Sequence, residues 1–295
     1  IIISNGFESY TLDFNISIKE ELDKVNKIIH HEEPHVIIID VLGCSSDSEY
    51  INCVKKISDL VVISFTDIHN KMCMLAADVV INSSILQMGN ESFYKENYYL
   101  GLDYCLLSSD YMNLPQVNQT SNTTKKVMVC MGGVDHNNLT LRVLNALDRS
   151  INNFEFSVIL SASYTDKEKM EAIKKSMNHK MKIHYDVDGI YAKLNTVDFA
   201  ITAGGNAHAE RISAGVPGIA ISQESHQDAS VVEYEKFGAT LNLGIYSELN
   251  EDTLLKSFDK LYENTALQDN MVNIGRKLLD GHGLQRVSNI IMQKK

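Results

Sequence analysis

A glycine pair between two apolar segments has the residue types and spacing for ligand chemistry. Gly204-Gly205 follows a predicted buried strand at residues 197–202 and precedes a predicted helix at about residues 206–214. Glycines let the backbone turn sharply and approach a ligand closely. A helix that begins there points its free N–H groups and its positive dipole end over the turn. The pattern predicts a diphosphate site, although a βαβ connection without a ligand has the same signature.

Polar residues near this turn are further candidates. Asn206 is a good N-cap, and we expect Glu210 on the first turn of the helix, where its carboxylate either holds a ribose diol or only favours the helix dipole. A second buried strand is predicted at residues 218–222, followed by a polar loop that ends at Gln227 and a helix at residues 228–237.

Histidines and aspartates give weaker candidates. His208 in the helix and His226 in the polar loop either face a cleft, where an imidazole neutralises phosphate or moves a proton, or lie exposed without a role, which is the more frequent case. Asp40 and Asp67 follow predicted buried strands and serve the site or only cap local backbone. The histidines and cysteines lack the spacing of a metal site, so we predict no metal and no cofactor.

The composition limits the class of protein. The chain of 295 residues has 44% hydrophobic and 22% charged residues, which is ordinary for a globular protein with two domains. Its net charge of −11 argues against nucleic acid as a partner, since phosphate binding needs a basic face. No apolar run approaches the roughly 18 residues of a membrane helix. Five cysteines without a C-x-x-C pair fit reduced thiols, so we predict a cytoplasmic location.

Strand and helix patterns alternate along the chain, which predicts an α/β protein with parallel sheets. The fold class is two Rossmann-like domains facing a cleft: residues 1–118, residues 124–280, and a C-terminal helix in 281–295 that packs back on the first domain. The polar stretch 114–126 is the predicted linker. Helices are predicted at 17–31, 47–60, 138–149, 166–176, 188–194, 251–263, 267–279 and 285–293, and further strands at 36–39, 61–65, 78–81, 104–107, 127–131, 155–160 and 181–184.

The segment AGG-x-x-x-x-E-x-x-x-x-G-x-P at residues 203–217, followed by a short strand and a loop that ends in Gln, resembles the C-terminal domain of GT-B-type nucleotide-sugar proteins. Within that group the chain is most similar to the UDP-2,4-diacetamido-2,4,6-trideoxy-β-L-altropyranose hydrolases of pseudaminic acid synthesis and to the related spore-coat polysaccharide proteins. The resemblance also covers GLDYCLLSSDY (101–111) and VMVCMGGVDHNNLTLRVLNAL (127–147).

The resemblance implies a UDP site in the second domain. It places the Gly132-Gly133 turn and Asp135 at the diphosphate or sugar, although a tight turn that Asp135 caps is an equal alternative. The loop 186–190 would read the uracil ring and also looks like a capped helix start. Glu210 would bind ribose and Gln227 the sugar or phosphate. The implied UDP-sugar-binding set is Gly132, Gly133, Asp135, Val187, Asp188, Ile190, Gly204, Gly205, Asn206, Glu210 and Gln227.

The implied activity is hydrolysis of an amino-deoxysugar nucleotide with release of UDP, in surface-glycan (nonulosonic acid) biosynthesis. A GT-B glycosyltransferase and a non-catalytic nucleotide-sugar-binding domain are the alternatives. Relatives open with a βα unit that carries G-x-G-H-x-x-R, and nothing here matches it. We therefore expect the first domain to lack this unit and the catalytic histidine to lie upstream of Ile1. The oligomeric state stays open.

Overall fold

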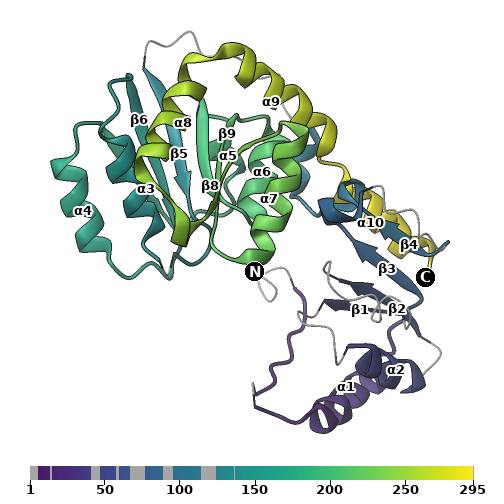
Figure 1. The fold of residues 1–295 in the computed structure, drawn as a ribbon. Helices are drawn as coiled ribbons and strands as arrows, with labels where there is room; N and C mark the ends of the chain where they lie inside the picture. Colours follow the sequence, from purple (N-terminus) through teal and green to yellow (C-terminus); the bar gives the residue numbers. More distant parts are fainter. Residues whose placement is uncertain are drawn as a thin grey trace. The chain divides into compact units, whose positions relative to one another are not determined.

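The computed structural model describes residues 6–13, 15–40, 47–57, 60–66, 77–88, 96–113, 124–135 and 137–294. They form two compact units (Figure 1). The first contains the described parts of Ile1–Asn82, Gly89–Leu100 and Ser288–Lys295, and the second those of Ser83–Met88 and Gly101–Val287. The predicted domain boundaries and the predicted cleft between the domains stay predictions, and most of the predicted linker lies outside the described residues.

The first unit is built on a parallel sheet of four strands in the order β1-β2-β3-β4. A core of aliphatic side chains joins the sheet to two helices that pack together. The first helix begins with a capping box, in which Ser17 and Glu20 satisfy each other's backbone N–H groups. The elements are α1 (Ile18–Glu32), β1 (Val36–Asp40), α2 (Asp47–Ile57), β2 (Val61–Phe65), β3 (Val79–Asn82) and β4 (Tyr98–Leu100).

Two expectations for this half of the chain were wrong. The all-apolar residues 36–39 are typical of a strand covered on both faces, but Ile38 of β1 is 49% exposed, and β1 is an edge strand among the described strands. Residues 104–107 form no strand. The chain makes a 3-10 turn there, η5 (Leu102–Tyr104), and the fourth strand lies earlier, at Tyr98–Leu100. A strand of three residues has too little periodicity to be predicted from the sequence.

The second unit has six parallel strands in the order β10-β9-β8-β5-β6-β7. Alternate residues of β5 point to opposite faces, so Val127 and Val129 join the core under α3 and α8, while Met128 and Cys130 join the core under α5 and α6. The elements are β5 (Lys125–Cys130), α3 (Leu139–Leu147), β6 (Phe154–Leu160), α4 (Lys167–Ser176), β7 (Met181–Tyr185), α5 (Tyr191–Leu194), β8 (Phe199–Ala203), α6 (Asn206–Ala214), β9 (Gly218–Ser222), α7 (Ser225–Phe237), β10 (Leu241–Ile245), α8 (Glu251–Glu263) and α9 (Thr265–Leu278). The last helix, α10 (Gly283–Gln293), begins in this unit, and its residues from Ser288 onward belong to the first.

An aspartate just before a strand fixes strand pairing in each unit. Asp198 precedes β8, and its carboxylate accepts a hydrogen bond from the backbone N–H of Lys126 at 2.8 Å. Asp78 precedes β3 and accepts from the N–H of Val62 at 2.9 Å. Because a slip of one residue would turn every strand side chain to the other face, these bonds help to hold the register of neighbouring parallel strands.

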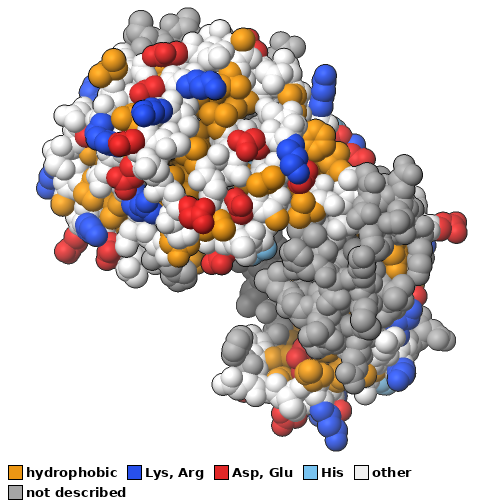
Figure 2. All heavy atoms as spheres, viewed as in Figure 1, with side chains coloured by type: hydrophobic (Ala, Val, Ile, Leu, Met, Phe, Trp, Pro, Cys, Tyr) orange, Lys and Arg blue, Asp and Glu red, His pale blue; other side chains and the backbone are white. Residues whose placement is uncertain are grey.

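The order of the strands creates a reversal in the second unit. The chain passes from β5 outward to β6 and β7 and then returns to the other side of β5 with β8. Connections that follow β5 and β8 therefore leave in opposite directions, and a crevice opens outside the carboxyl ends of these strands. On the visible face of this unit, acidic and basic side chains are interspersed (Figure 2).

We expect Phe258→Ala to destabilise the protein strongly. Phe258 is fully buried on α8, with its ring 5.1 Å from Phe154 and 6.0 Å from Phe199. A phenylalanine-to-alanine change in such a core costs about 3–5 kcal/mol. Ile151→Ala is the control, because Ile151 is 98% exposed and a surface change of this kind stays within about 0.5 kcal/mol. Urea unfolding followed by circular dichroism compares the midpoints, and equal midpoints would contradict this account of the core.

Candidate functional site

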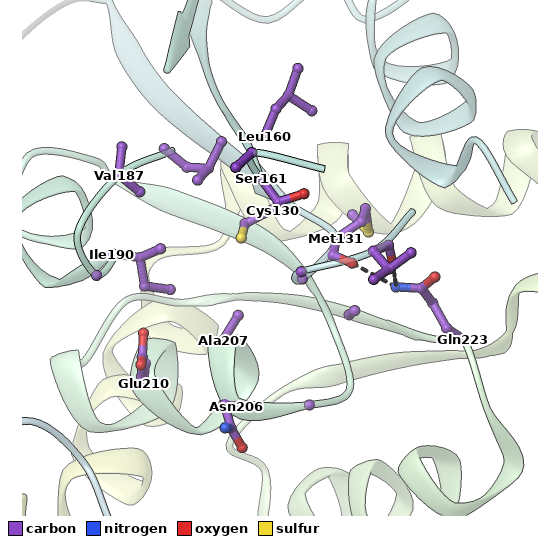
Figure 3. Close-up of a pocket in the computed structure, with 18 of the residues that line it drawn as sticks. Cys130, Met131, Leu160, Ser161, Val187, Ile190, Asn206, Ala207, Glu210 and Gln223 are labelled. Carbon is purple, nitrogen blue, oxygen red and sulfur yellow. Dashed lines mark hydrogen bonds between the residues drawn. The ribbon is translucent and has the colours of Figure 1, made fainter. Parts of the chain in front are cut away.

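A cavity of about 630 Å³ lies at the carboxyl end of the second sheet. Its walls include the last residues of three strands, Cys130 of β5, Leu160 of β6 and Ala203 of β8, together with the loops that follow them (Figure 3). It therefore occupies the crevice that the strand reversal creates. This position and volume are typical of a site for a small molecule.

The structure brings many of the predicted site residues together and leaves others outside the cavity. The cavity is lined by Gly132, Gly133, Val187, Ile190, Gly205, Asn206, Glu210 and Gln227. The residues that do not line it are Asp135, Asp188, Gly204, His208 and His226. All of these positions lie in the second unit.

The two glycines of the turn have different reasons to be glycine. A Cβ on Gly204 would lie 2.8 Å from Cγ2 of Val231 and 3.0 Å from Cβ of Gln227, so β8 and α7 meet too closely for a side chain. The nearest neighbour of a Cβ on Gly205 would be the Gln227 amide nitrogen, at 3.7 Å. Gly204 is therefore needed for packing, whereas Gly205 leaves space open toward the cavity.

Helix α6 begins one residue earlier than the capping argument expected. Gly205 is the N-cap, without a side-chain hydrogen bond, and Asn206 is the first helical residue. Glu210 consequently lies past the first turn, which holds no acidic residue. The prediction that Asn206 caps the helix was wrong because the backbone leaves helical angles already at Gly205. The exposed side chain of Asn206 instead lines the cavity.

Helix α7 also begins earlier than expected, at Ser225. His226 and Gln227 lie in its first turn and not in a loop. The side-chain oxygen of Gln227 accepts a hydrogen bond from the backbone N–H of Gln223 at 3.0 Å, which satisfies the chain at the entry to the helix. Both α6 and α7 thus present their N-terminal ends to the cavity, through Asn206 and Gln227.

Gln223 is a residue of the site that the sequence did not single out. Its side-chain amide donates to the carbonyl of Met131 at 2.6 Å and to that of Val134 at 3.2 Å (Figure 3). These bonds hold the glycine turn after β5 against the loop after β9. The position of Gln223 directly after a buried strand was the available signal, because side chains at strand ends share one edge of a parallel sheet.

In the loop after β5, Asp135 caps the next helix, whereas the two glycines line the cavity. The carboxylate of Asp135 accepts from the N–H groups of Leu139 at 2.7 Å and Thr140 at 2.9 Å, so it caps α3. Of the two alternatives for Asp135, the structure shows the cap. The backbone at Gly132 is left-handed, with φ of +80°, which favours glycine there. At Gly133, an added Cβ would meet nothing within 4 Å.

The loop before α5 forms an apolar side of the cavity. Val187 and the buried Ile190 line it together with Ile159 and Leu160 (Figure 3). Asp188 is exposed and does not line the cavity. The expected N-capped helix start is absent, because α5 begins only at Tyr191 and its N-cap, Ile190, makes no side-chain hydrogen bond. An apolar wall with exposed backbone suits a flat heterocyclic ring.

Neither histidine candidate lines the cavity. His208 is 1% exposed and packs edge-on against Tyr234, with 5.2 Å between ring centroids. Burial, with Arg211 adding to the effect, lowers the pKa of His208 well below its ordinary value. The expected choice between a cleft and an exposed position was wrong for His208, since a helix residue on the inner face is buried against α7. His226 is exposed.

The cavity has no cationic side chain among the described residues that line it, while Glu210, Glu224 and Asp186 do line it. The nearby Arg211 is buried and donates to the carbonyl of Val216 and to the hydroxyl of Thr240, so its guanidinium ties α6 to the strands behind it. An anion in this cavity would depend on the N–H groups at the starts of α6 and α7.

A metal site requires several ligating side chains that lie close together. Within the described residues, no group of three or more His, Cys, Asp or Glu side chains has the arrangement of a metal site. Asp40 is exposed at the end of β1 in the first unit, and Asp67 lies outside the described residues. The expectations of no metal and no cofactor stay predictions.

We expect Gly204→Ala to lower the melting temperature more than Gly205→Ala, which only replaces the N-cap glycine of α6. The added methyl group at Gly204 meets Val231 and Gln227 below ordinary contact distance, and overpacking typically costs about 1–3 kcal/mol. The methyl group at Gly205 would make only an ordinary contact, 3.7 Å from the Gln227 amide nitrogen. Differential scanning fluorimetry of both variants measures the difference. Equal melting temperatures would show that α7 does not pack on Gly204 as described.

The chain has relatives of similar sequence among known proteins. No protein-family model matches the sequence. Over 288 residues the chain is 26% identical to the spore coat polysaccharide biosynthesis protein SpsG of Bacillus subtilis (strain 168), with 94% of this chain and 83% of SpsG covered. It is 24% identical over 245 residues to the uncharacterized protein MJ1062 of Methanocaldococcus jannaschii, where the match spans 80% of this chain and 48% of that protein.

Solved structures show the fold. Acinetobacter baumannii MurG superimposes with a TM-score of 0.72 at 14% identity, covering 99% of this chain and 86% of MurG. Spinosyn rhamnosyltransferase SpnG complexed with thymidine diphosphate gives 0.63 at 14% identity, with 91% and 74% covered. The co-structure of Staphylococcus aureus MnaA with UDP gives 0.63 at 12% identity, with 96% and 80% covered.

The chain has the GT-B fold of glycosyltransferases, with two α/β domains that are each built on a parallel sheet. The expected fold class is confirmed in this respect. Among the described helices, none has the length and apolar character needed to cross a membrane.

Proposed function

We propose that the cavity of the second unit binds the UDP moiety of a nucleotide sugar and that the protein is an enzyme of polysaccharide biosynthesis. The observation that carries this proposal is the open Gly205 turn at the strand reversal, which faces the cavity beside the starts of α6 and α7, with the Glu210 carboxylate on the same wall. Helix starts favour a diphosphate, and a carboxylate accepts hydrogen bonds from a ribose diol.

The comparisons support the same class of ligand. SpsG is named for spore coat polysaccharide biosynthesis, and two structures that share the fold contain thymidine diphosphate and UDP. The apolar side formed by Val187, Ile190 and Leu160 suits a pyrimidine ring. The glycine turn suits the diphosphate, and the Gly133 side of the cavity leaves room for the sugar.

The reaction that we propose is hydrolysis of an amino-deoxysugar nucleotide. The oxygen of water forms a bond to the anomeric carbon, the bond from that carbon to the diphosphate oxygen breaks, and UDP leaves with the electron pair. The proton that the attacking water loses passes to the solvent. Preorganised N–H groups at the start of α6 stabilise the charge that develops on the diphosphate. The catalytic histidine and the cytoplasmic location stay predictions.

Transfer of the sugar to an alcohol acceptor is the second candidate, because the fold is shared with glycosyltransferases. Binding without catalysis is the third, because neither His208 nor His226 reaches the cavity. All three functions use the same UDP site and differ in what reaches the anomeric carbon.

We expect UDP to stabilise the protein against heat, since a ligand that binds only the folded state at 100 times its Kd adds about 2.7 kcal/mol. AMP, which carries a purine and a single phosphate, should give a smaller shift, because it lacks the diphosphate that the two helix starts are proposed to bind. Differential scanning fluorimetry with millimolar nucleotide measures both shifts. A melting temperature that UDP leaves unchanged would contradict the proposed site.

We expect Glu210→Gln to weaken UDP binding about ten- to a hundredfold, because a hydrogen bond to a charged group contributes roughly 1.5–3 kcal/mol. Burial raises the pKa of Glu210, so the contribution of the ionised carboxylate should fade as the pH falls through this raised pKa. UDP itself titrates near a pH of about 6, and the Gln variant serves as the reference that removes this effect. Calorimetry at several pH values measures the ratio of the two affinities, and a constant ratio of one would contradict the role of Glu210.

Turnover distinguishes the three functions. We expect UDP-linked amino-deoxysugars to release UDP and free sugar without any acceptor. Anion-exchange chromatography with mass spectrometry measures both products. Release only in the presence of an alcohol acceptor would favour transfer. Binding of UDP without turnover under either condition would favour the non-catalytic function.

A further inference from the structure

Tyr111 contacts Glu210 from outside the cavity. Tyr111 belongs to the 3-10 helix η6 (Ser109–Asn113) and is 1% exposed. Its hydroxyl donates a hydrogen bond to Oε2 of Glu210 at 3.2 Å. The two residues are 99 positions apart in the sequence, so only the tertiary structure brings them together.

The ring of Tyr111 is held beside the apolar wall of the cavity. It packs edge-on against Tyr191, with 4.9 Å between centroids and 79° between planes. Tyr191 is the first residue of α5, directly after Ile190, which lines the cavity. Tyr111 thus connects the loop at the proposed base site with the carboxylate at the proposed ribose site.

Gly281 and Gly283 approach the backbone of η6 and of the chain that precedes it very closely. A Cβ on Gly281 would lie 2.1 Å from the carbonyl oxygen of Tyr111, and Gly281 also has a φ of +78°. A Cβ on Gly283 would lie 2.0 Å from the carbonyl oxygen of Cys105. Because these backbones are in direct contact, Tyr111 has little freedom to move away from Glu210.

We propose that Tyr111 is a positioning residue that orients Glu210 for the ribose and so gives the site its preference for a ribonucleotide over a deoxyribonucleotide. Its hydroxyl engages Oε2, and the structure shows no hydrogen bond from a described residue to Oε1, which leaves that oxygen for the ribose hydroxyls. The inference rests on the proposed UDP site and adds a residue to it.

The surroundings of Glu210 explain why one neutral hydroxyl matters. The Tyr111 hydroxyl donates to its carboxylate, and the charge of Glu210 contributes to the raised pKa values of the thiols of Cys105 and Cys130. Burial and the Glu210 charge raise the pKa of Cys105 to about 11, so this thiol stays neutral. On its own helix, Arg211 bonds to backbone and Thr240, and His208 is neutral. Burial raises the pKa of Glu210, and the hydrogen bond from Tyr111 opposes that rise.

Calorimetric titration of the full chain with UDP and with 2′-deoxy-UDP tests the inference. Tyr111→Phe should weaken UDP binding about three- to tenfold, the range of one net hydrogen bond, and should weaken 2′-deoxy-UDP binding less. Adding Tyr111→Phe to Glu210→Gln should cause no further loss. The pH at which UDP affinity falls should be higher in Tyr111→Phe than in the parent, because the carboxylate loses a bond that favours its ionised form.

Tyr262→Phe is the matched control. Its hydroxyl donates to the carbonyl of Asn153 at 2.9 Å, and Tyr262 lines no part of the cavity. The variant therefore loses one tyrosine hydrogen bond without touching Glu210. It should lower the melting temperature by an amount similar to Tyr111→Phe and leave the Kd of UDP unchanged.

The outcomes separate this inference from the proposed function. If the parent protein binds no UDP, the proposed site is wrong. If the parent binds UDP and Glu210→Gln weakens it, but Tyr111→Phe binds both nucleotides as the parent does, the positioning role is wrong. It is also wrong if the losses from Tyr111→Phe and Glu210→Gln simply add, because independent effects would show that Tyr111 does not act through Glu210.

Discussion

The close packing of Gly204 on α7 is the constraint on which the candidate site depends. A side chain at this position would collide with Val231 and Gln227, so the turn after β8 and the start of α7 come together only with glycine there. Their contact brings the N-terminal ends of α6 and α7 to one cavity. The strand reversal opens the crevice, and the missing side chain lets two helix starts share it.

An anion in the candidate site would be bound by backbone N–H groups and not by side-chain charge. The described lining residues include carboxylates and no Lys or Arg, and the fully buried Arg211 uses its donors on a backbone carbonyl and on Thr240. Burial lowers the pKa of Arg211 to about 9 because its charge has no carboxylate partner to offset desolvation. For the proposed ligand, oriented N–H groups at the starts of α6 and α7 would supply the positive potential.

Two carboxylates that the sequence predicted for the site show how similar sequence patterns lead to different contacts. Asp135 and Glu210 each follow a glycine turn after a buried strand. Asp135 finds N–H groups four and five residues away and caps α3, an outcome fixed by local geometry. Among the described residues Glu210 has no local donor, and its carboxylate accepts a hydrogen bond from Tyr111 of a distant segment. A short polar side chain near a helix start bonds locally, while one farther along the helix depends on what packs against it.

Local patterns in the sequence determined the α/β class, the parallel strands β2, β8 and β9, and helices such as α6 and α8, because apolar periodicity and glycine stops act over a few residues. They also indicated the glycine turn and Glu210 at the cavity. Only the tertiary structure decided that His208 is buried, that Gln223 joins two loops and that Tyr111 reaches Glu210. These contacts join segments from different strands and helices, and one sequence shows which residues are present but not which distant segments meet.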